Sequence, residues 1–447
     1  MTAEGPLAGV TVVAVEQAVS APLCTRALGD LGARIIKVEG PDGGDFTRHY
    51  DDVVHGLAAH FVWVNRGKES VVLDLKSPQG MNVLHRLLDR ADVFVSNLAP
   101  GSAAKIGITA DDLAARHPDL ITMEIDGYGP GGPLSHKRAY DMLVQAEAGA
   151  CAITGLPGAP AKPGPPMADV CTGLYAALTI TALLAERGRT GRGRSPGPTS
   201  VSASASASAS ASASASASAS ASASASASAS VSMFDTVTEL MGYALTYTRH
   251  TGIDQKPVGM GSPAVAPYGA YLTADGHTVV LGTTNDREWQ RYARDLLGRP
   301  DLADDDRLST TAGRVAEREW LDGEIARWCA ERTLGVIQAA ADAAGIGNAK
   351  LNKPSEVLAH PQLAARDRWR EIGTPGGPSP ALLPPPVLRG RVAPMGDVPA
   401  LGEHTEALLH ELGFTEDELT SPDTSVGVRA ATAAAPDVSA PAGSEQR

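Results

Sequence analysis

The sequence predicts an α/β fold in which a large domain built on a parallel sheet is joined to a smaller α+β domain. Short β-branched runs alternate with stretches of helical periodicity from Gly9 to Asp126. A second series of helix and strand patterns follows a low-complexity tract. With 447 residues, 43% of them hydrophobic, the chain has enough apolar material for two domains.

Five runs in the first region have the composition of strands: GVTVVAVE, RIIKVE, SVVLDL, DVFVS and LITMEI. Helical stretches such as APLCTRALGDLGA and PQGMNVLHRLLDRA lie between several of them. This alternation indicates right-handed βαβ units and a Rossmann-like parallel sheet. We therefore expect the active edge at the carboxyl ends of the strands.

Two helices complete the first part of the large domain, which we assign to residues 6–195. The Gly-rich loop from Tyr128 to Asp141 leads into one helical run. The second helix is predicted from about Asp169 to Arg187, and the Gly-rich GRTGRG ends it.

A low-complexity insertion is predicted over residues 196–232. Residues 202–230 alternate strictly between serine and alanine, so they offer no large side chain to bury. We expect a disordered loop because chain entropy then outweighs burial, with a silk-like strand as the alternative. The flanking SVS and VSMFD resemble one short strand interrupted by a repeated dipeptide, which suggests a repeat expansion in a surface connection.

The smaller domain is predicted over residues 233–352. MFDTVTELMGYALTYTRH is an amphipathic helix, and HTVVLGT is a strand. Three further helices are predicted: Asp286–Leu297, Arg314–Cys329 and Thr333–Ala344.

The last part of the chain is expected to return to the large domain over residues 353–415. The Pro- and Gly-rich run from Gly373 to Pro386 predicts an extended linker, and GEHTEALLHELGF predicts a short helix capped by Gly413. Residues 416–447 are rich in Ala, Pro, Ser and Thr and are expected to be disordered.

Composition excludes several classes of function. The net charge is −13, and Lys and Arg form no cluster with aromatic residues, so a nucleic-acid partner is not expected. Four scattered cysteines predict neither a disulfide framework nor a metal site. The start lacks the pattern of a signal peptide, and the longest apolar run, Ala176 to Ala185, is about half of a bilayer crossing. We expect a cytoplasmic protein without a membrane anchor.

The sequence contains no Walker loop, no GxGxxG after the first strand, no HExxH and no GxSxG. What remains is a set of carboxylates beside Gly-rich turns, of which Asp169 in PPMADVCTG is the clearest. An Asp at the start of a helix is commonly an N-cap, and it can also be a nucleophile surrounded by free N–H groups. The residues alone leave both roles open.

A series of segments in this order resembles the family III CoA transferases, of the formyl-CoA transferase and carnitine CoA transferase type. The resemblance spans Pro6 to Gly413 and omits the Ser/Ala tract. The segments are GPLAGVTVVAVE, LGDLGARIIKVEGPDGGDFTR, NRGKESVVLDLKSPQG, DVFVSNLAPGSAAKIGI, YGPGGPLSHKRAYDMLVQAEAG, MADVCTG, RTGRGRS, VSMFD, APYGAYLTADG and PALGEHTEALLHELG.

The resemblance implies an enzyme that moves CoA from an acyl-CoA donor, such as succinyl-CoA, to a carboxylic acid. Asp169 matches the family's nucleophile, which forms an acyl anhydride and then an aspartyl-CoA thioester. With a reference pKa of about 3.9 an Asp is ionised at neutral pH, so no metal or added cofactor is expected and the CoA thioester is itself the substrate. Backbone N–H groups at the helix start would stabilise the developing oxyanion.

Related α-methylacyl-CoA racemases pair the same Asp with a His, and the matching position here is Tyr140 in RAYD. A tyrosine, with a reference pKa near 10, is a poor second acid for racemisation, so CoA transfer is preferred. In the transferases this tyrosine lines the acyl pocket, so Tyr140 and the adjacent Asp141 are candidate substrate contacts. Tyr140 packing on the core is the structural alternative. A non-catalytic CoA-binding paralogue is the third interpretation.

The resemblance also implies a set of CoA contacts. Residues matching positions that hold the adenosine and phosphates are Leu73, Lys76, Asn97, Lys105 and Arg138. Basic side chains near a diphosphate fit that role. Two polar positions of the formyl-CoA type are changed, to Val19 and Gly40, which makes oxalate or formate an unexpected substrate; Gln17 lies two residues from the first and is not equated with it.

Gly259 and Gly261 in VGMGSP match a glycine loop that closes over the intermediate, with a plain turn as the alternative. The segments NDREWQRYARDLLGRPDLADDDR and GNAKLNKPSEVLAHPQLAARDRW resemble the branch that acts on C4 and C5 dicarboxylates. Such an acceptor needs an extra cation. Arg48, Arg66 and Lys137 are the candidates, and the sequence does not choose among them.

Members of the family are interlocked homodimers, in which each large domain is built from both chain ends and long linkers lead to the small domain. The resemblance therefore implies a homodimer of this kind. The chain has the required N-terminal α/β part, middle domain and return segment.

Overall fold

A computed structural model describes residues 5–190 and 227–415 of the chain. The chain divides into two compact units. The first combines residues up to Tyr140, from Ala168 to Thr236 and from Trp369 onward, and the second combines 141–167 and 237–368. The predicted disordered tail, and the Ser/Ala tract up to residue 226, lie outside the described residues.

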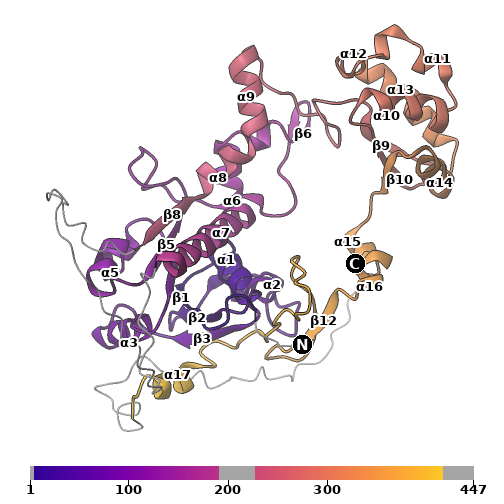
Figure 1. Cartoon of the computed structure of the whole chain (residues 1–447). Coiled ribbons are helices and arrows are strands. Elements are labelled where there is room, and N and C mark those ends of the chain that lie inside the picture. Colours follow the sequence, from indigo (N-terminus) through magenta and orange to yellow (C-terminus); the bar gives the residue numbers. More distant parts are fainter. Residues whose placement is uncertain (1–4, 191–226, 416–447) are drawn as a thin grey trace, which may run out of the picture. The chain divides into compact units, whose positions relative to one another are not determined.

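The first unit is built on a six-stranded sheet in the order β3-β2-β1-β4-β5-β8, with all neighbours parallel (Figure 1). The strands are β1 (Thr11–Val15), β2 (Arg34–Glu39), β3 (Lys68–Val72), β4 (Val93–Ser96), β5 (Ile121–Asp126) and β8 (Ser228–Ser232). The five strands predicted before the insertion are confirmed, as is the α/β class. The order reverses between β1 and β4, and in such sheets the crevice beyond the strand ends at this point holds the ligand.

Strand β8 corrects the prediction that the insertion is disordered through residue 232. Ser228 lies opposite Thr122 of β5, and Val231 lies opposite Ile125. The strand is at the edge of the sheet, where backbone hydrogen bonds to β5 stabilise it without large side chains. Ala229 and Val231 turn toward the core, and Ser228 and Ser230 turn outward, so the alternation fits a half-buried strand.

Helices cover both faces of this sheet. On one face α1 (Ser20–Gly29) and α7 (Met167–Thr190) pack against β1, β4 and β5. On the other, α3 (Pro78–Leu88) and α17 (Thr405–Glu411) share a core with β1, β2 and β4. The remaining elements of the unit are η1 (Phe46–His49), α2 (Ala59–Asn65), α4 (Ser102–Ile106) and α5 (Ala110–Arg116).

By length and composition alone, α7 is the one helix of the described residues that could cross a membrane. Core helices pass the same test, and α7 buries one face, including Ala176 and Ile180, against the sheet. Its outer face leaves Leu174 and Leu178 exposed.

The return segment contains a hairpin where an extended linker was predicted. Strands β12 (Trp369–Ile372) and β13 (Ser379–Leu382) pair antiparallel. The Thr374 and Gly377 backbones bond to each other reciprocally across a Pro-Gly-Gly turn, and Gly377 has φ +132°. The turn residues, interpreted as a linker, instead reverse the chain. Helix α17 then ends before Gly413, which has φ +86° as predicted for a cap.

The second unit has its own core around a three-stranded antiparallel sheet in the order β11-β10-β9. Its strands are β9 (Tyr268–Leu272), β10 (Thr278–Gly282) and β11 (Gly347–Lys350), with a short pair β6 (Gly155–Leu156) and β7 (Ala159–Pro160). Helix α8 (Met233–Leu240) contains the point at which the chain passes from the first unit to the second. The helices of the second unit are α6 (Asp141–Glu147), η2 (Ala150–Ala152), α9 (Gly242–Thr251), α10 (Asp286–Arg291), η3 (Tyr292–Leu296), α11 (Pro300–Ala303), η4 (Asp306–Leu308), α12 (Thr311–Ala316), α13 (Arg318–Ala330), α14 (Leu334–Ala344), α15 (Pro354–Leu358) and α16 (Pro361–Ala365).

The predicted domain boundaries need two corrections. Residues 141–167 group with the second unit, although they were assigned to the large domain, and the return begins at Trp369 instead of residue 353. Both errors arise because the chain passes from one unit to the other several times, and Pro- and Gly-rich composition does not mark each of these crossings. The predicted helix from Arg314 to Cys329 is also divided, because α12 ends at Ala316 and α13 begins at Arg318.

Candidate active site

Asp169 lies in the first turn of α7, two residues after the helix begins at Met167. It is half-buried. The position is inside the helix and not before it, so the N-cap role considered from the sequence is not the one that Asp169 has. A carboxylate here lies at the positive end of the helix dipole, which favours its ionised form.

The beginning of α7 packs closely on the beginning of α1. A Cβ atom added at Gly173 would lie 2.4 Å from the Ser20 carbonyl oxygen, so only glycine permits the two backbones to approach this far. Val170 packs against Val19 and Leu23. The turn that carries Asp169 is therefore fixed against the first turn of α1, directly after the β1–α1 loop.

Tyr50 lies within electrostatic range of Asp169 and of Tyr140. Partial burial and then the charges of Asp45 and Asp169, with Tyr140 contributing, raise the pKa of the Tyr50 phenol. Tyr50 therefore stays neutral and keeps an O–H donor near the carboxylate. Its side chain is 57% exposed, and that of Tyr140 is 58% exposed, so Tyr140 faces outward and does not pack on the core.

The sequence analysis missed Tyr50, which belongs to a chain of exposed rings. The Tyr50 ring lies 5.7 Å from Phe46 and 5.7 Å from His60, and His60 lies 6.3 Å from Trp63. A signal was present in the composition: aromatic residues make up only 4% of the chain, and several lie between residues 46 and 63. Exposed rings beside a carboxylate offer an apolar wall for a substrate.

The predicted CoA contacts come from the segments after β3 and β4, where Lys105 lies in α4, and from the loop before Tyr140. Lys76, Lys105 and Arg138 are exposed and fit binding of phosphates. Leu73 is buried in the sheet core, and its N–H donates to the Glu39 carbonyl. The Asn97 side chain forms hydrogen bonds with the Gln17 backbone. The side chains of Leu73 and Asn97 are therefore already in use within the protein, and contact of either residue with CoA stays a prediction.

The three candidate cations for an acidic substrate are now distinguished. Arg48 is buried and pairs with Glu39 at 2.7 Å. Arg66 is buried and pairs with Asp30 at 2.7 Å. Lys137 is exposed and lies over the Tyr128 ring at 5.4 Å. The two arginines are occupied by structural pairs, which leaves Lys137 as the candidate that a substrate can reach.

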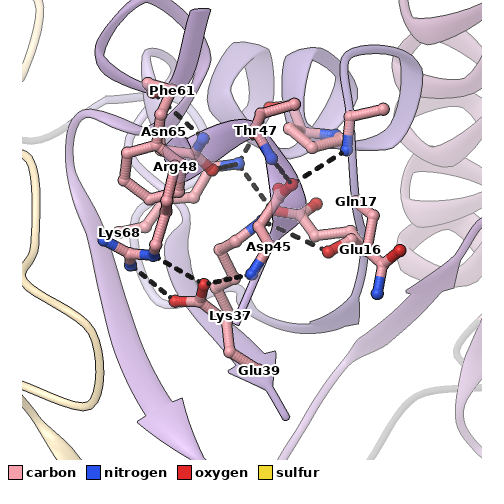
Figure 2. A network of polar contacts seen from close by, with 12 residues as sticks. Glu16, Gln17, Lys37, Glu39, Asp45, Thr47, Arg48, Phe61, Asn65 and Lys68 are labelled. Atoms are coloured by element: carbon pink, nitrogen blue, oxygen red, sulfur yellow. Dashed lines mark hydrogen bonds and ion pairs between the residues drawn. The ribbon is translucent and has the colours of Figure 1, made fainter. Parts of the chain in front are cut away.

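A set of buried charges comes from β2, β3 and the loops that follow β1 and β2 (Figure 2). We call Glu16, Lys37, Asp45 and Lys68 the loop clamp. Lys37 Nζ donates to Asp45 Oδ2 at 2.9 Å, and Lys68 Nζ donates to Glu16 Oε1 at 2.6 Å. The four side chains are almost fully buried and carry two positive and two negative charges. Sequence reasoning missed them because isolated charges in strands and loops give no motif.

Burial dominates the titration of Lys68. It opposes the charged ammonium more strongly than Glu16 favours it and, with the nearby Lys37 charge, lowers the pKa of Lys68 to about 8. Burial also opposes the charge on Lys37, but Glu16, Asp45 and Glu39 together outweigh it and raise the pKa of that lysine. Lys37 is therefore the permanent cation of the loop clamp.

A second buried set adjoins the loop clamp, and we call Glu39, Arg48 and Ser70 the return clamp. Arg48 donates to both Glu39 oxygens, at 2.8 and 2.7 Å, and stacks over Phe61 at 3.8 Å. Arg48 also donates to the Pro399 carbonyl, and Ser70 Oγ accepts from the Gly402 N–H. Although burial favours the neutral acid, the bonds from Arg48 and Ser70 and the charge of Lys37 lower the pKa of Glu39 to about 2.

The remaining predicted site residues belong to the second unit. Gly259 has φ +61°, and its N–H donates to the Gly155 carbonyl. A Cβ atom at Gly261 would lie 3.1 Å from the Val258 carbonyl oxygen, so both glycines form a tight turn. Asp141 begins α6 and accepts from the Gln145 side chain at 2.8 Å. Within 5–190 and 227–415, no group of three His, Cys, Asp or Glu side chains is placed to hold a metal ion.

Comparison with known proteins gives consistent matches over nearly the whole chain. Residues 7–206 and 195–405 match CoA-transferase family III. Succinate–glutarate CoA-transferase of Agrobacterium fabrum is 31% identical over 433 residues, 93% of this chain and 98% of that protein. Human succinyl-CoA:glutarate CoA-transferase is 29% identical over 95% of this chain and 90% of that protein. A CaiB/BaiF family protein from Brucella suis matches with a TM-score of 0.73 and 29% identity, over 92% of this chain and all of that one.

Proposed function

Because the chain belongs to CoA-transferase family III and is an enzyme of that family, we propose that it moves CoA from succinyl-CoA to a dicarboxylic acid, with Asp169 as the nucleophile. The family match confirms the resemblance found in the sequence. The observation that carries the mechanism is the position of Asp169, in the first turn of α7 and within electrostatic range of Tyr50.

The proposed reaction needs only the carboxylate and the two substrates. An Asp169 oxygen attacks the thioester carbonyl carbon, the C–S bond breaks, and CoA leaves as the thiolate, which gives a mixed anhydride. The thiolate then attacks the Asp169 carbonyl carbon and releases the donor acid, which gives an aspartyl-CoA thioester. The acceptor carboxylate repeats these steps in reverse, and Asp169 is regenerated as a carboxylate. The carboxylate of the acceptor is consumed, the carboxylate of the donor acid is released, and Asp169 ends as the carboxylate that it was at the start. The charges therefore balance, and no oxidant or proton donor is required.

The surroundings of Asp169 support charge that develops on oxygen during these steps. The N-terminal turn of α7 places Asp169 at the positive end of the helix dipole, which favours negative charge there. The Tyr50 phenol stays protonated because its pKa is raised, so it can donate a hydrogen bond to the acyl oxygen. The exposed rings of Phe46 and Tyr50 would line the apolar part of the acyl group.

A dicarboxylate acceptor fits both the relatives and the surface of the first unit. The named relatives act on glutarate, and others in the comparison on D-citramalate and L-malate. Lys137 is the exposed candidate for the second carboxylate. We expect Lys137→Ala to raise the KM for glutarate about tenfold, the weight of one charge-assisted hydrogen bond, while the KM for succinyl-CoA changes less. Lys105→Ala should show the opposite pattern.

We also propose that the enzyme acts as an interlocked homodimer. The outer face of α7 exposes Leu174, Tyr175 and Leu178, an apolar surface on the helix that carries Asp169. A second copy of the chain would cover such a surface. Sedimentation velocity at nanomolar concentration tests the proposal, because an interlocked dimer cannot release a folded monomer on dilution.

The decisive experiment is the intact mass of the protein after incubation with succinyl-CoA. The wild type should gain a CoA-sized adduct, and hydroxylamine should trap the acyl intermediate on the peptide that contains Asp169. Asp169→Ala should form neither product, whereas Glu186→Ala, at the exposed far end of the same helix, should form both.

The outcomes separate the proposed function from its alternatives. A trapped adduct with a new CoA ester of glutarate supports transfer to a dicarboxylate. No adduct in a folded wild-type dimer, with exchange of the α-proton of a 2-methylacyl-CoA in deuterated water, would assign the chain to racemase chemistry. Retained turnover in Asp169→Ala would remove Asp169 from the mechanism.

A further inference from the structure

The connection between β1 and α1 is held by side chains instead of by the sheet. Lys37 Nζ donates to the Glu16 carbonyl at 3.2 Å. The Asn97 side chain binds both backbone groups of Gln17, at 2.9 and 2.7 Å. Asp45 Oδ1 accepts from the Ala18 N–H at 3.3 Å. Consecutive backbone groups of this loop are therefore fixed by residues from β2, from the loop after β2 and from the end of β4.

The loop contains a backbone conformation that its residue disfavours. Ala18 has φ +64°, one of three non-glycine residues with positive φ among those described. A left-handed alanine is destabilised by about 1–2 kcal/mol because its Cβ crowds the following carbonyl, and such residues persist only where their surroundings hold them. Glycine adopts this conformation freely.

Asp45 is placed to hold it. Its side chain is buried, and both oxygens accept hydrogen bonds. Oδ1 accepts from Ala18 N, Thr47 N and Thr47 Oγ1, and Oδ2 accepts from Lys37 Nζ (Figure 2). Asparagine has only one oxygen. If that oxygen faces Lys37, its NH₂ group faces the Ala18 and Thr47 donors, and if it faces those donors, the NH₂ group meets the Lys37 ammonium. Asp45→Asn therefore breaks one side of the network that holds the loop in either orientation, at almost constant shape.

The loop leads directly to the proposed nucleophile. Val19 is the N-cap residue of α1 and makes no side-chain capping bond, and Val19 and Leu23 pack on Val170, the residue after Asp169. The close approach at Gly173 fixes the two helix starts against each other. A change in the backbone at Ala18 would therefore move the first turn of α1 relative to the first turn of α7.

We propose that Asp45 is a positioning residue for CoA transfer, because it holds Ala18 in the left-handed conformation that sets α1 against the turn carrying Asp169. The inference rests on the proposed function, in which Asp169 is the nucleophile. Lys37 supports Asp45 in this role as its buried counter-charge.

The test is a double-mutant cycle between Asp45→Asn and Ala18→Gly, measured as kcat and KM for transfer from succinyl-CoA to glutarate. Asp45→Asn should lower kcat about 100-fold, the loss that a shift of about 1 Å at a reacting group produces, with a smaller change in KM. In the Ala18→Gly background the same substitution should cost less than about tenfold, because glycine no longer needs the contact to hold its φ.

A matched control neutralises a second buried carboxylate, at the opposite end of α1 from the β1–α1 loop. Asp30 follows α1 at its other end and pairs with Arg66, so Asp30→Asn makes the same chemical change away from the loop. It should leave kcat within about threefold of wild type, because substitutions far from a site act independently of it. Hydrogen exchange of the peptide covering residues 16–23 should accelerate in Asp45→Asn and not in Asp30→Asn.

The results distinguish failure of this inference from failure of the proposed function. An equal loss from Asp45→Asn in both Ala18 and Ala18→Gly backgrounds, or unchanged exchange at residues 16–23, overturns the positioning role. Wild-type protein that is folded but transfers CoA to no acceptor refutes the function instead, and the exchange measurement still decides whether Asp45 holds the loop. If Asp45→Asn does not fold, Thr47→Val, which removes one of the bonds to Asp45 Oδ1, should show the same rescue by Ala18→Gly at smaller amplitude.

Discussion

The loop clamp and the return clamp lie side by side and use the same chemistry for different purposes. Both are buried carboxylates paired with buried cations, and Glu39 of the return clamp accepts from the Asp45 N–H of the loop clamp. The loop clamp binds backbone groups that lead to α1. The return clamp binds Pro399 and Gly402, far along the chain. Buried charge therefore says little by itself about function, and the backbone that it binds decides its role.

Removing a cation from the loop clamp should give the largest combined effect. Lys37→Met leaves Asp45 and part of Glu16 without their buried partner, which we expect to lower the free energy of unfolding by about 3–5 kcal/mol. The rate of CoA transfer per folded molecule should fall as well, because Asp45 loses its orientation. Urea unfolding and kcat on the same preparation check both, and a stability loss with an unchanged kcat would contradict the functional half of the comparison.

Removing a cation from the return clamp should separate stability from activity. Arg48→Met removes the ion-pair partner of the buried Glu39 and should lower the free energy of unfolding by a similar amount, about 3–5 kcal/mol. Its kcat per folded molecule should stay within about threefold of wild type because the β1–α1 loop keeps its contacts. A loss of kcat as large as that of Lys37→Met would show that the two clamps act as one unit.

Acid should weaken the return clamp in a defined pH range. The pKa of Glu39 is lowered from 4.5 to about 2 in the folded protein, so the unfolded chain takes up this proton first as the pH falls. The stability that Glu39 contributes is complete above pH 4.5 and is lost as the pH falls toward 2, by about 3 kcal/mol in total. Urea unfolding at intervals over this range measures the slope. Arg48→Met should flatten it, and an equally steep slope in that variant would assign the effect to other acids.

The fold could be predicted much further from the sequence than the site could. Strand patterns such as RIIKVE and helix patterns such as the run beginning at Pro78 have the periods of their elements, so hydrophobic burial makes them visible locally. The hairpin between β12 and β13 was missed because Pro and Gly also mark linkers. Strand β8 had only been an alternative to disorder for its Ser/Ala part, because its pairing with β5 lies in the backbone, where Ser and Ala give no signal.

The site was predictable only where a residue stands in a motif. Asp169 was singled out by its motif and its place at a helix start, the structure places it in the first turn of α7, and its role as the nucleophile stays a prediction. Tyr50, Asp45 and Lys37 were not, because their roles depend on contacts between segments that the sequence does not place side by side. Arg48 shows the opposite error: a basic residue near a motif was a candidate for substrate binding, and the structure gives its guanidinium to Glu39 and Pro399.

Tyr50 gives the smallest effect and connects the two clamps. It directly follows η1, whose N-cap is Asp45 and whose third residue is Arg48, so both clamps determine where its ring lies. Tyr50→Phe keeps the ring and removes the hydroxyl, and we expect kcat/KM for succinyl-CoA to fall about 3- to 10-fold, as for loss of one neutral hydrogen bond. Tyr243→Phe, an equally exposed tyrosine on α9, is the control and should change nothing. The return clamp affects catalysis through Tyr50 if Arg48→Met lowers kcat/KM in the wild-type background but not in the Tyr50→Phe background. If Arg48→Met lowers kcat/KM in neither background, the role of the return clamp is confined to stability.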